Sequence, residues 1–155
     1  MSVVVVPATA DRFGDVTAVL APRDPDAPAC WCLYYRCTSS QFSKLRGAER
    51  PAALRSLCER QVAPGVLAPR RPGRRWCALG PRAEMGRLQR SRTIPAVDDT
   101  PVWSVVCFVV RSGFRRQGVA AALLDGAIAY AAETSAHSAG RSRWLMRLDL
   151  AAQRG

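Results

Sequence analysis

The sequence predicts an α/β fold, in which a mixed, mostly antiparallel sheet is flanked by helices. Three observations support this prediction. Residues 102–110, VWSVVCFVV, are almost continuously apolar, which is typical of a strand buried on both faces. An alanine-rich helical segment follows at 119–133, and a β-branched strand over 3–6 precedes an amphipathic segment over 10–20. The length of 155 residues, of which 48% are hydrophobic and 23% charged, suits a single globular domain over 1–155.

The N-terminal third alternates between short elements and loops. We expect Pro7 to end the first strand and Thr9 to be the N-cap of the following helix. Three prolines and two aspartates predict a loop over 21–29. The apolar and aromatic residues of 30–37 predict an extended segment, whereas 38–49 is featureless.

The middle of the chain predicts a helix and a hairpin. Apolar residues recur at helical spacing over 50–62, with Pro51 in the first turn. Two short strands, 66–68 and 75–79, flank a turn rich in proline and arginine. A long polar connection over 80–101 follows, and a connection of this length is usually functional or mobile. Its expected apolar anchors are Met85 and Leu88.

The C-terminal part predicts a buried helix, a polar loop over 134–142 and a last strand over 144–150. The apolar positions of the helix 119–133 fall on one face at helical spacing. The expected buried face consists of Val119, Leu123, Leu124, Ala127, Ile128 and Ala131.

The six cysteines are predicted to be free, mostly buried thiols. The chain shows no secretion signal and the cysteine spacings are irregular, which argues against a disulfide framework. Cys30, Cys32 and Cys37 are close enough in sequence to suggest zinc, but a second CxxC or a histidine pair is missing and His137 is the only histidine. We therefore expect no metal.

The formal net charge of +11 comes from arginine almost alone, since Lys44 is the only lysine. Such a surface can attract nucleic acid, acidic lipid or phosphorylated ligands. The arginines are scattered along the chain, so we expect most of them on a solvated surface and do not expect a nucleic-acid partner. No apolar run is long enough to span a bilayer, and the N-terminus lacks the features of a signal peptide, which together predict a cytoplasmic protein.

A phosphate site is predicted where the strand 102–110 leads into the helix 119–133. The first turn of a helix carries N–H groups without intrahelical partners and the positive end of the helix dipole. Gly118 allows a ligand to approach the main chain, and Ala120 keeps the next position small. Arg115 and Arg116 add positive charge suited to phosphate oxygens.

The segment Arg115-Arg116-Gln117-Gly118-Val119-Ala120 resembles the Arg/Gln-x-x-Gly-x-Gly/Ala pyrophosphate loop of the GNAT acetyltransferase superfamily, and it stands between the expected strand and helix. The resemblance covers roughly residues 3–150 and is strongest over 102–133. The Cys-Trp-Cys segment at 30–32 and the stretch Asp98–Phe108 also resemble a bacterial subgroup of that superfamily, for which we know no established substrate.

The resemblance implies an acetyl-CoA-dependent N-acetyltransferase. The pantetheine arm of acetyl-CoA would pair like an extra strand with the main chain of Phe108, Val109 and Val110. An N–H group near Val109 or Val110 would stabilise the oxyanion of the tetrahedral intermediate. The implied ligands of the pyrophosphate are Arg115, Arg116, Gln117, Gly118, Val119 and Ala120.

The expected reaction moves the acetyl group to a primary amine of a small molecule or protein, and the amine must lose a proton. The candidate bases are Glu84, Asp98 and Asp99, in the connection before the cofactor strand; each is otherwise a solvated loop carboxylate. Cys107 could suggest an acyl-cysteine route, but its place within an apolar strand favours a core residue.

The sequence departs from the family pattern at its end, because it stops just after the fifth expected strand. The family's usual further helix and two strands, and a tyrosine that often protonates the leaving thiolate, have no counterpart here. A bare edge at 144–150 would favour association, so a homo-dimer is expected. Two alternative functions remain open: a CoA-binding remnant or sensor without competent catalysis, and a basic RNA-associated acetyltransferase.

Overall fold

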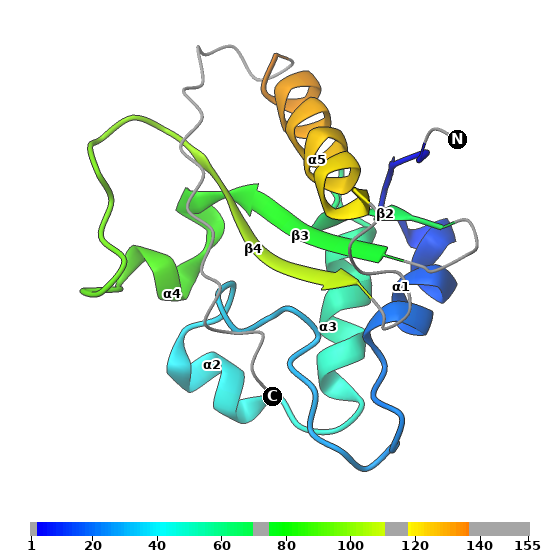
Figure 1. Ribbon diagram of the computed structural model, residues 1–155. Helices are drawn as coiled ribbons and strands as arrows, with labels where there is room; N and C mark the ends of the chain where they lie inside the picture. Colours follow the sequence, from blue (N-terminus) through cyan, green and yellow to red (C-terminus); the bar gives the residue numbers. More distant parts are fainter. Residues whose placement is uncertain (1–2, 70–74, 111–117, 137–155) are drawn as a thin grey trace.

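The computed structural model describes residues 3–69, 75–110 and 118–136 (Figure 1). In chain order the elements are β1 (Val6–Pro7), the 3-10 helix η1 (Ala10–Arg12), α1 (Phe13–Leu20), α2 (Ser39–Lys44), α3 (Glu49–Cys58), β2 (Gly65–Ala68), β3 (Arg75–Pro81), the 3-10 helix η2 (Arg82–Glu84), α4 (Gly86–Gln89), β4 (Trp103–Val110) and α5 (Val119–Ala136). None of the helices in these ranges has the length and apolarity that crossing a bilayer requires.

The strands form one antiparallel sheet in the order β1-β2-β3-β4. Helix α5 packs on one face, mainly against β2 and β3, while α1 and α3 lie on the other face (Figure 1). The predicted α/β class with a mostly antiparallel, helix-flanked sheet is therefore confirmed.

Strand β3 divides the core into two layers, because its side chains alternate between the faces of the sheet. Trp76 and Ala78 point into a cluster with α1, α3 and the 32–33 segment. Cys77 and Leu79 point into a second cluster, where they meet the buried face of α5. All of these strand side chains are at most 2% exposed, so the central strand is fixed from both sides.

Most of the predicted elements are confirmed. The helix expected over 10–20 is present as η1 followed by α1, and the hairpin as β2 and β3. Thr9 stands at the N-cap, but its hydroxyl donates to the Asp11 carboxylate and does not cap the helix. The helix expected over 50–62 ends earlier, at Cys58, and the final strand predicted over 144–150 lies outside the described residues.

Three predictions about burial and extension are wrong. Residues 30–37 form turns, because Leu33 and Cys37 donate main-chain hydrogen bonds to Cys30 and Leu33, and the turns bury two successive residues, Cys32 and Leu33. An extended strand would send these side chains to opposite sides.

Ile128 lies on the exposed side of α5, and every residue of β4 is partly exposed. The expectation that β4 is buried on both faces fails because, in the described ranges, β4 pairs only with β3 and contacts α5 less than β2 and β3 do.

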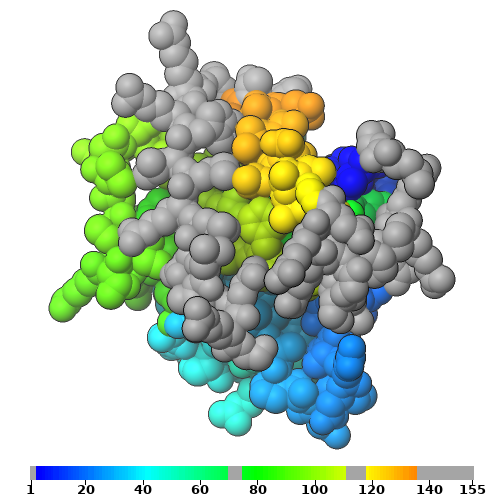
Figure 2. Space-filling view, in the orientation of Figure 1, coloured from blue at the N-terminus to red at the C-terminus, as the bar shows by residue number. Residues whose placement is uncertain are grey.

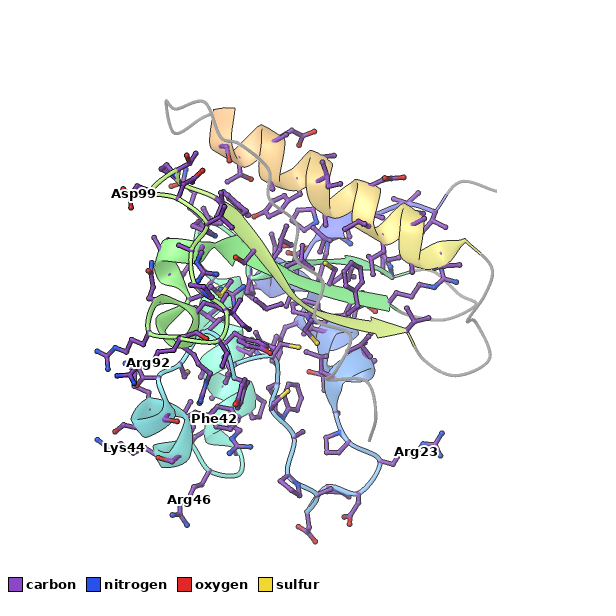
Figure 3. All side chains as sticks on the ribbon, turned by 60° about the vertical axis from the view of Figure 1, so that its left-hand side comes forward. Arg23, Phe42, Lys44, Arg46, Arg92 and Asp99 are labelled. Carbon is purple, nitrogen blue, oxygen red and sulfur yellow. The ribbon has the colours of Figure 1, made fainter. Side chains whose placement is uncertain are left out.

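Four arginines fix the irregular segments by donating to main-chain carbonyls. Arg36 Nη2 donates to Pro64 O at 2.6 Å and to Leu79 O at 2.8 Å. Arg50 and Arg82 each donate to two carbonyls, and Arg87 donates to Tyr34 O and to the Ser39 hydroxyl. For these four the expected solvated role is wrong, whereas Arg23, Lys44, Arg46 and Arg92 do extend outward (Figure 3).

Candidate functional site

Strand β4 carries the residues expected to face the pantetheine arm. In its pairing with β3, Phe108 stands opposite Cys77, Val109 opposite Trp76, and Val110 opposite Arg75. Phe108 packs into the α5 side of the sheet and Val109 into the opposite side. These three residues are therefore the last of β4, at the end from which the chain continues to α5.

A β-bulge interrupts β4 just before these residues. The Cα pairing runs from Ala78–Cys107 to Leu79–Val105, so Val106 is an extra residue on β4. Val106 and Cys107 both pack into the cluster on the α1 and α3 side. Bulges bend a strand and redirect its main-chain groups, and they are common beside functional sites.

The start of α5 combines a glycine in a left-handed conformation with the first turn of a long helix. Gly118 adopts a left-handed φ of 70°, which favours glycine. A Cβ placed on Gly118 would meet no heavy atom of the described residues within 4 Å. Val119 is buried and anchors the helix, while Ala120 is exposed. The first turn of α5, whose N–H groups have no partners within the helix, lies beside the surface of β4 (Figure 2).

Arg75 is an unexpected charged residue at this end of the sheet. It is the first residue of β3 and lies opposite Val110, yet it is only 6% exposed. The sequence predicts a strand over 75–79 but indicates no role for this side chain. The only signal was a charged residue at the edge of an apolar strand, which ordinarily indicates a solvated strand end.

The three candidate bases lie elsewhere. Glu84, in η2, approaches Arg60 with a distance of 3.9 Å between carboxylate oxygen and guanidinium nitrogen, and both side chains are about half exposed. Asp98 accepts a hydrogen bond from the Thr100 main-chain N–H, and Asp99 is exposed on the loop before β4 (Figure 3). Because β4 separates this loop from Gly118, the structure does not bring the aspartates to the phosphate end of the strand. Their catalytic role stays a prediction.

A chain of thiols lies behind β4. The Trp76 indole N–H donates to Cys32 Sγ at 3.1 Å, and Trp31 and Cys32 hold left-handed φ values of 49° and 55°. Cys32 also contacts Cys107 and Cys30: its interaction with Cys107 raises the pKa of Cys32, while its hydrogen bond to Cys30 lowers the pKa of Cys30 to about 6.

The described cysteines have no disulfide, and within those ranges no three cysteine, histidine or acidic side chains are arranged to hold a metal ion. Cys107 is partly buried and packs against the core cluster on the α1 and α3 side. The prediction that the protein carries no metal stays untested.

Only some of the residues expected to contact the phosphates are among those that the structure describes. Gly118, Val119 and Ala120 have the positions just described, whereas Arg115, Arg116 and Gln117 lie outside the described residues. The sequence motif and the strand that precedes it are nevertheless adjacent in the chain, and α5 follows directly.

Comparison with known families agrees with this geometry. Residues 76–146 match the profile of the Acetyltransferase (GNAT) family. The matched region begins within β3 and includes β4, the motif at 115–120 and α5. No curated protein and no solved structure gives a significant match to the chain. Over residues 76–146 the chain thus has the sequence pattern of the GNAT acetyltransferase family.

Proposed function

We propose that this protein transfers an acetyl group from acetyl-CoA to a primary amine of a small molecule or protein. The match of residues 76–146 to the Acetyltransferase (GNAT) family supports an acetyltransferase-type reaction. The choice of cosubstrate rests mainly on Gly118 at the start of α5, which has a left-handed φ and would meet no heavy atom of the described residues if a Cβ were added. A diphosphate group suits this position, because the helix N-terminus favours negative charge.

In this proposal, acetyl-CoA lies along the end of β4. Its pyrophosphate accepts hydrogen bonds from the main chain at Gly118, Val119 and Ala120, with Arg115, Arg116 and Gln117 contributing from the preceding segment. Its pantetheine amides pair with the main chain of Phe108, Val109 and Val110. The bulge at Val106 supports this placement, since it redirects the main chain of β4 just before that stretch.

The proposed chemistry is direct transfer. The neutral amine attacks the thioester carbonyl, and an N–H group at Val109 or Val110 stabilises the oxyanion that forms. A base accepts the proton of the amine, and collapse of the intermediate breaks the carbon–sulfur bond. The CoA thiolate that leaves takes up a proton from the protonated base or from water and is released as the thiol. Glu84, Asp98 and Asp99 are the proposed bases, acting directly or through water.

Gly118→Glu tests the cosubstrate. A carboxylate at this position would occupy the phosphate site and repel it, and a larger residue would strain the left-handed main chain. We expect calorimetry to detect no CoA binding to this variant. Gly118→Asn is the matched control, because asparagine tolerates a left-handed φ and adds no charge. CoA binding by Gly118→Glu with the affinity of the wild type would contradict the proposed site.

A thiol-release assay with a panel of amines tests the reaction itself. Release of CoA thiol that depends on an added amine would support acetyl transfer. Tight CoA binding without any thiol release would instead favour a cofactor-binding module without catalysis, which is the alternative function predicted from the sequence.

A further inference from the structure

Arg75 is a buried charged residue with an unsatisfied guanidinium nitrogen. The residue is only 6% exposed, and its Nε has no hydrogen-bond partner among the residues that the structure describes. No ion pair joins it to a carboxylate in the part of the chain that the structure describes. Burying an unpaired charge is costly, so a guanidinium in this position is expected to meet an anion that the described residues do not supply.

The position of Arg75 on the sheet indicates where its side chain points. Along β3, residues 75, 77 and 79 share one face, and Cys77 and Leu79 on that face pack against α5. Arg75 is also the residue paired with Val110, at the end of β4. The guanidinium therefore lies on the α5 side of the sheet, at the end of β4 that leads to α5.

The direction of α5 places its first turn at the same end. Tyr130, in the later part of the helix, stacks edge-on against Trp103 at the beginning of β4, with ring centroids 6.0 Å apart. The earlier turns of α5 must then lie toward the other end of β4, near Val110 and Arg75. The Arg75 guanidinium and the N-terminus of α5 therefore lie at the same end of the sheet. Gly118, which no described residue crowds, stands at the start of that helix.

We propose that Arg75 is a ligand of the CoA pyrophosphate, contributed by β3 in addition to the main-chain donors of α5. This inference rests on the proposed use of acetyl-CoA. A guanidinium presents several N–H donors in a planar fork that matches phosphate oxygens, and it remains charged when buried. Phosphate binding would give Arg75 the anionic partner it lacks and would couple β3 to occupancy of the site.

Arg75→Met tests this role by calorimetry with three ligands: CoA, 3′-dephospho-CoA, and S-acetylpantetheine, which has no phosphate. We expect the variant to bind CoA and 3′-dephospho-CoA about 10-fold or more weakly than the wild type, because it loses a charge-assisted contact. Binding of S-acetylpantetheine should not change. Arg23→Met, in an exposed loop, removes the same charge at a distance and should leave all three affinities unchanged (Figure 3).

Thermal unfolding separates ligand binding from a structural role. Replacing a buried, unpaired charge by an apolar side chain of similar length should leave the midpoint of the ligand-free protein unchanged or higher. The rise in midpoint on adding CoA should be smaller than in the wild type. A lower midpoint without ligand, together with unchanged CoA affinity, would assign Arg75 to the fold and overturn the proposal.

The remaining outcomes are also decisive. If the wild type binds CoA and Arg75→Met binds it equally well, Arg75 is not a ligand although the proposed function stands. If Arg75→Met binds CoA more weakly than the wild type does but binds 3′-dephospho-CoA equally well, the guanidinium contacts the 3′-phosphate and the assignment to the pyrophosphate is wrong. If the wild type binds none of the three ligands, the proposed function itself fails. Arg75→Lys, which keeps the charge but loses the fork, should give an intermediate loss.

Discussion

Single arginine side chains determine the conformation of the segments that lack regular structure. Arg36 is the clearest case, since one of its nitrogens bridges Pro64 O and Leu79 O and so ties the 30–37 turns to the start of β2 and to β3. A guanidinium can make such contacts because its donors are held in a rigid plane. Lysine, with one flexible ammonium group, would not reproduce this geometry.

Arg36→Met should destabilise the protein by about 2–4 kcal/mol, because it removes two part-buried hydrogen bonds to main-chain carbonyls that hold the 30–37 turns against β3. Urea unfolding followed by circular dichroism measures this change. Arg55→Met is the matched control: Arg55 is 60% exposed and its distance to Glu59 is 3.9 Å. Its substitution should change the free energy of unfolding by less than about 0.5 kcal/mol. Equal effects of the two substitutions would refute the role given to Arg36.

Cys30 should be the most reactive described thiol at neutral pH. The hydrogen bond from Cys32 lowers the pKa of Cys30 to about 6, and Cys30 is exposed. Burial raises the pKa of Cys58 to about 11 and also raises the pKa of Cys77. Because the thiolate is the nucleophile, the rate of alkylation at Cys30 should rise with pH and reach half its maximum near pH 6.

Alkylation with iodoacetamide, read by peptide mass spectrometry across a pH series, measures this rate for each cysteine. Cys32→Ala removes the donor and should move the midpoint at Cys30 upward, toward the value of about 8.5 expected for an ordinary thiol. A wild-type midpoint already near that value would show that the hydrogen bond does not stabilise the thiolate.

Among the elements, α5 and the N-terminal segment are in unusually close contact. A Cβ placed on Gly126, in the middle of α5, would lie less than 3.0 Å from three side-chain atoms of Val5. Glycine within a helix costs about 1 kcal/mol relative to alanine. The close approach of Val5 therefore explains why this position in an otherwise alanine-rich helix holds glycine.

Gly126→Ala should destabilise the protein by about 1–3 kcal/mol despite the better helix propensity of alanine, because α5 and the segment before β1 must separate. Val5→Ala combined with Gly126→Ala should recover much of that loss, since the smaller side chain makes room. Guanidinium chloride unfolding of the two single variants and the double variant measures the coupling. A stabilising Gly126→Ala would mean that Val5 moves away at no cost.

Elements with strong periodicity were predictable, and tertiary relations were not. The helix 10–20, the hairpin and the β4–α5 unit follow from apolar spacing alone, and the motif at 115–120 identified the family. The 30–37 segment was mispredicted because two non-glycine residues adopt left-handed φ, which no local signal indicates. Helix α2 was missed although Thr38 and Gln41 form a capping box. The burial of Arg75 was not predicted because a charged residue at the start of an apolar strand ordinarily indicates a solvated strand end.

For the whole molecule, the dominant electrostatic fact is a net charge of +11, because 12 acidic side chains offset only about half of the 23 basic ones. Within the described ranges the recorded ion pairs are both exposed and have distances of 3.9 Å. Contacts of this kind contribute little. Most of the positive charge therefore acts at long range, where an anionic cosubstrate would be attracted before it makes any contact.

The association rate with CoA should fall about 10-fold or more between about 20 mM and about 500 mM salt, because the screening length shortens severalfold over this range. Stopped-flow measurement of binding gives the rate. The uncharged S-acetylpantetheine should show little dependence on salt. A CoA association rate independent of salt would exclude long-range attraction as a contribution to binding.

The contacts of Arg36, Arg50 and Arg82 have a consequence for how this protein can evolve. Each guanidinium meets main-chain oxygens, so the side chains of the contacted residues are free to change without breaking the bond. In a set of homologous sequences these arginines should be retained while their partner positions vary independently. Methods that infer contacts from correlated substitutions should therefore miss these interactions, although they hold the longest irregular stretches of the fold in place.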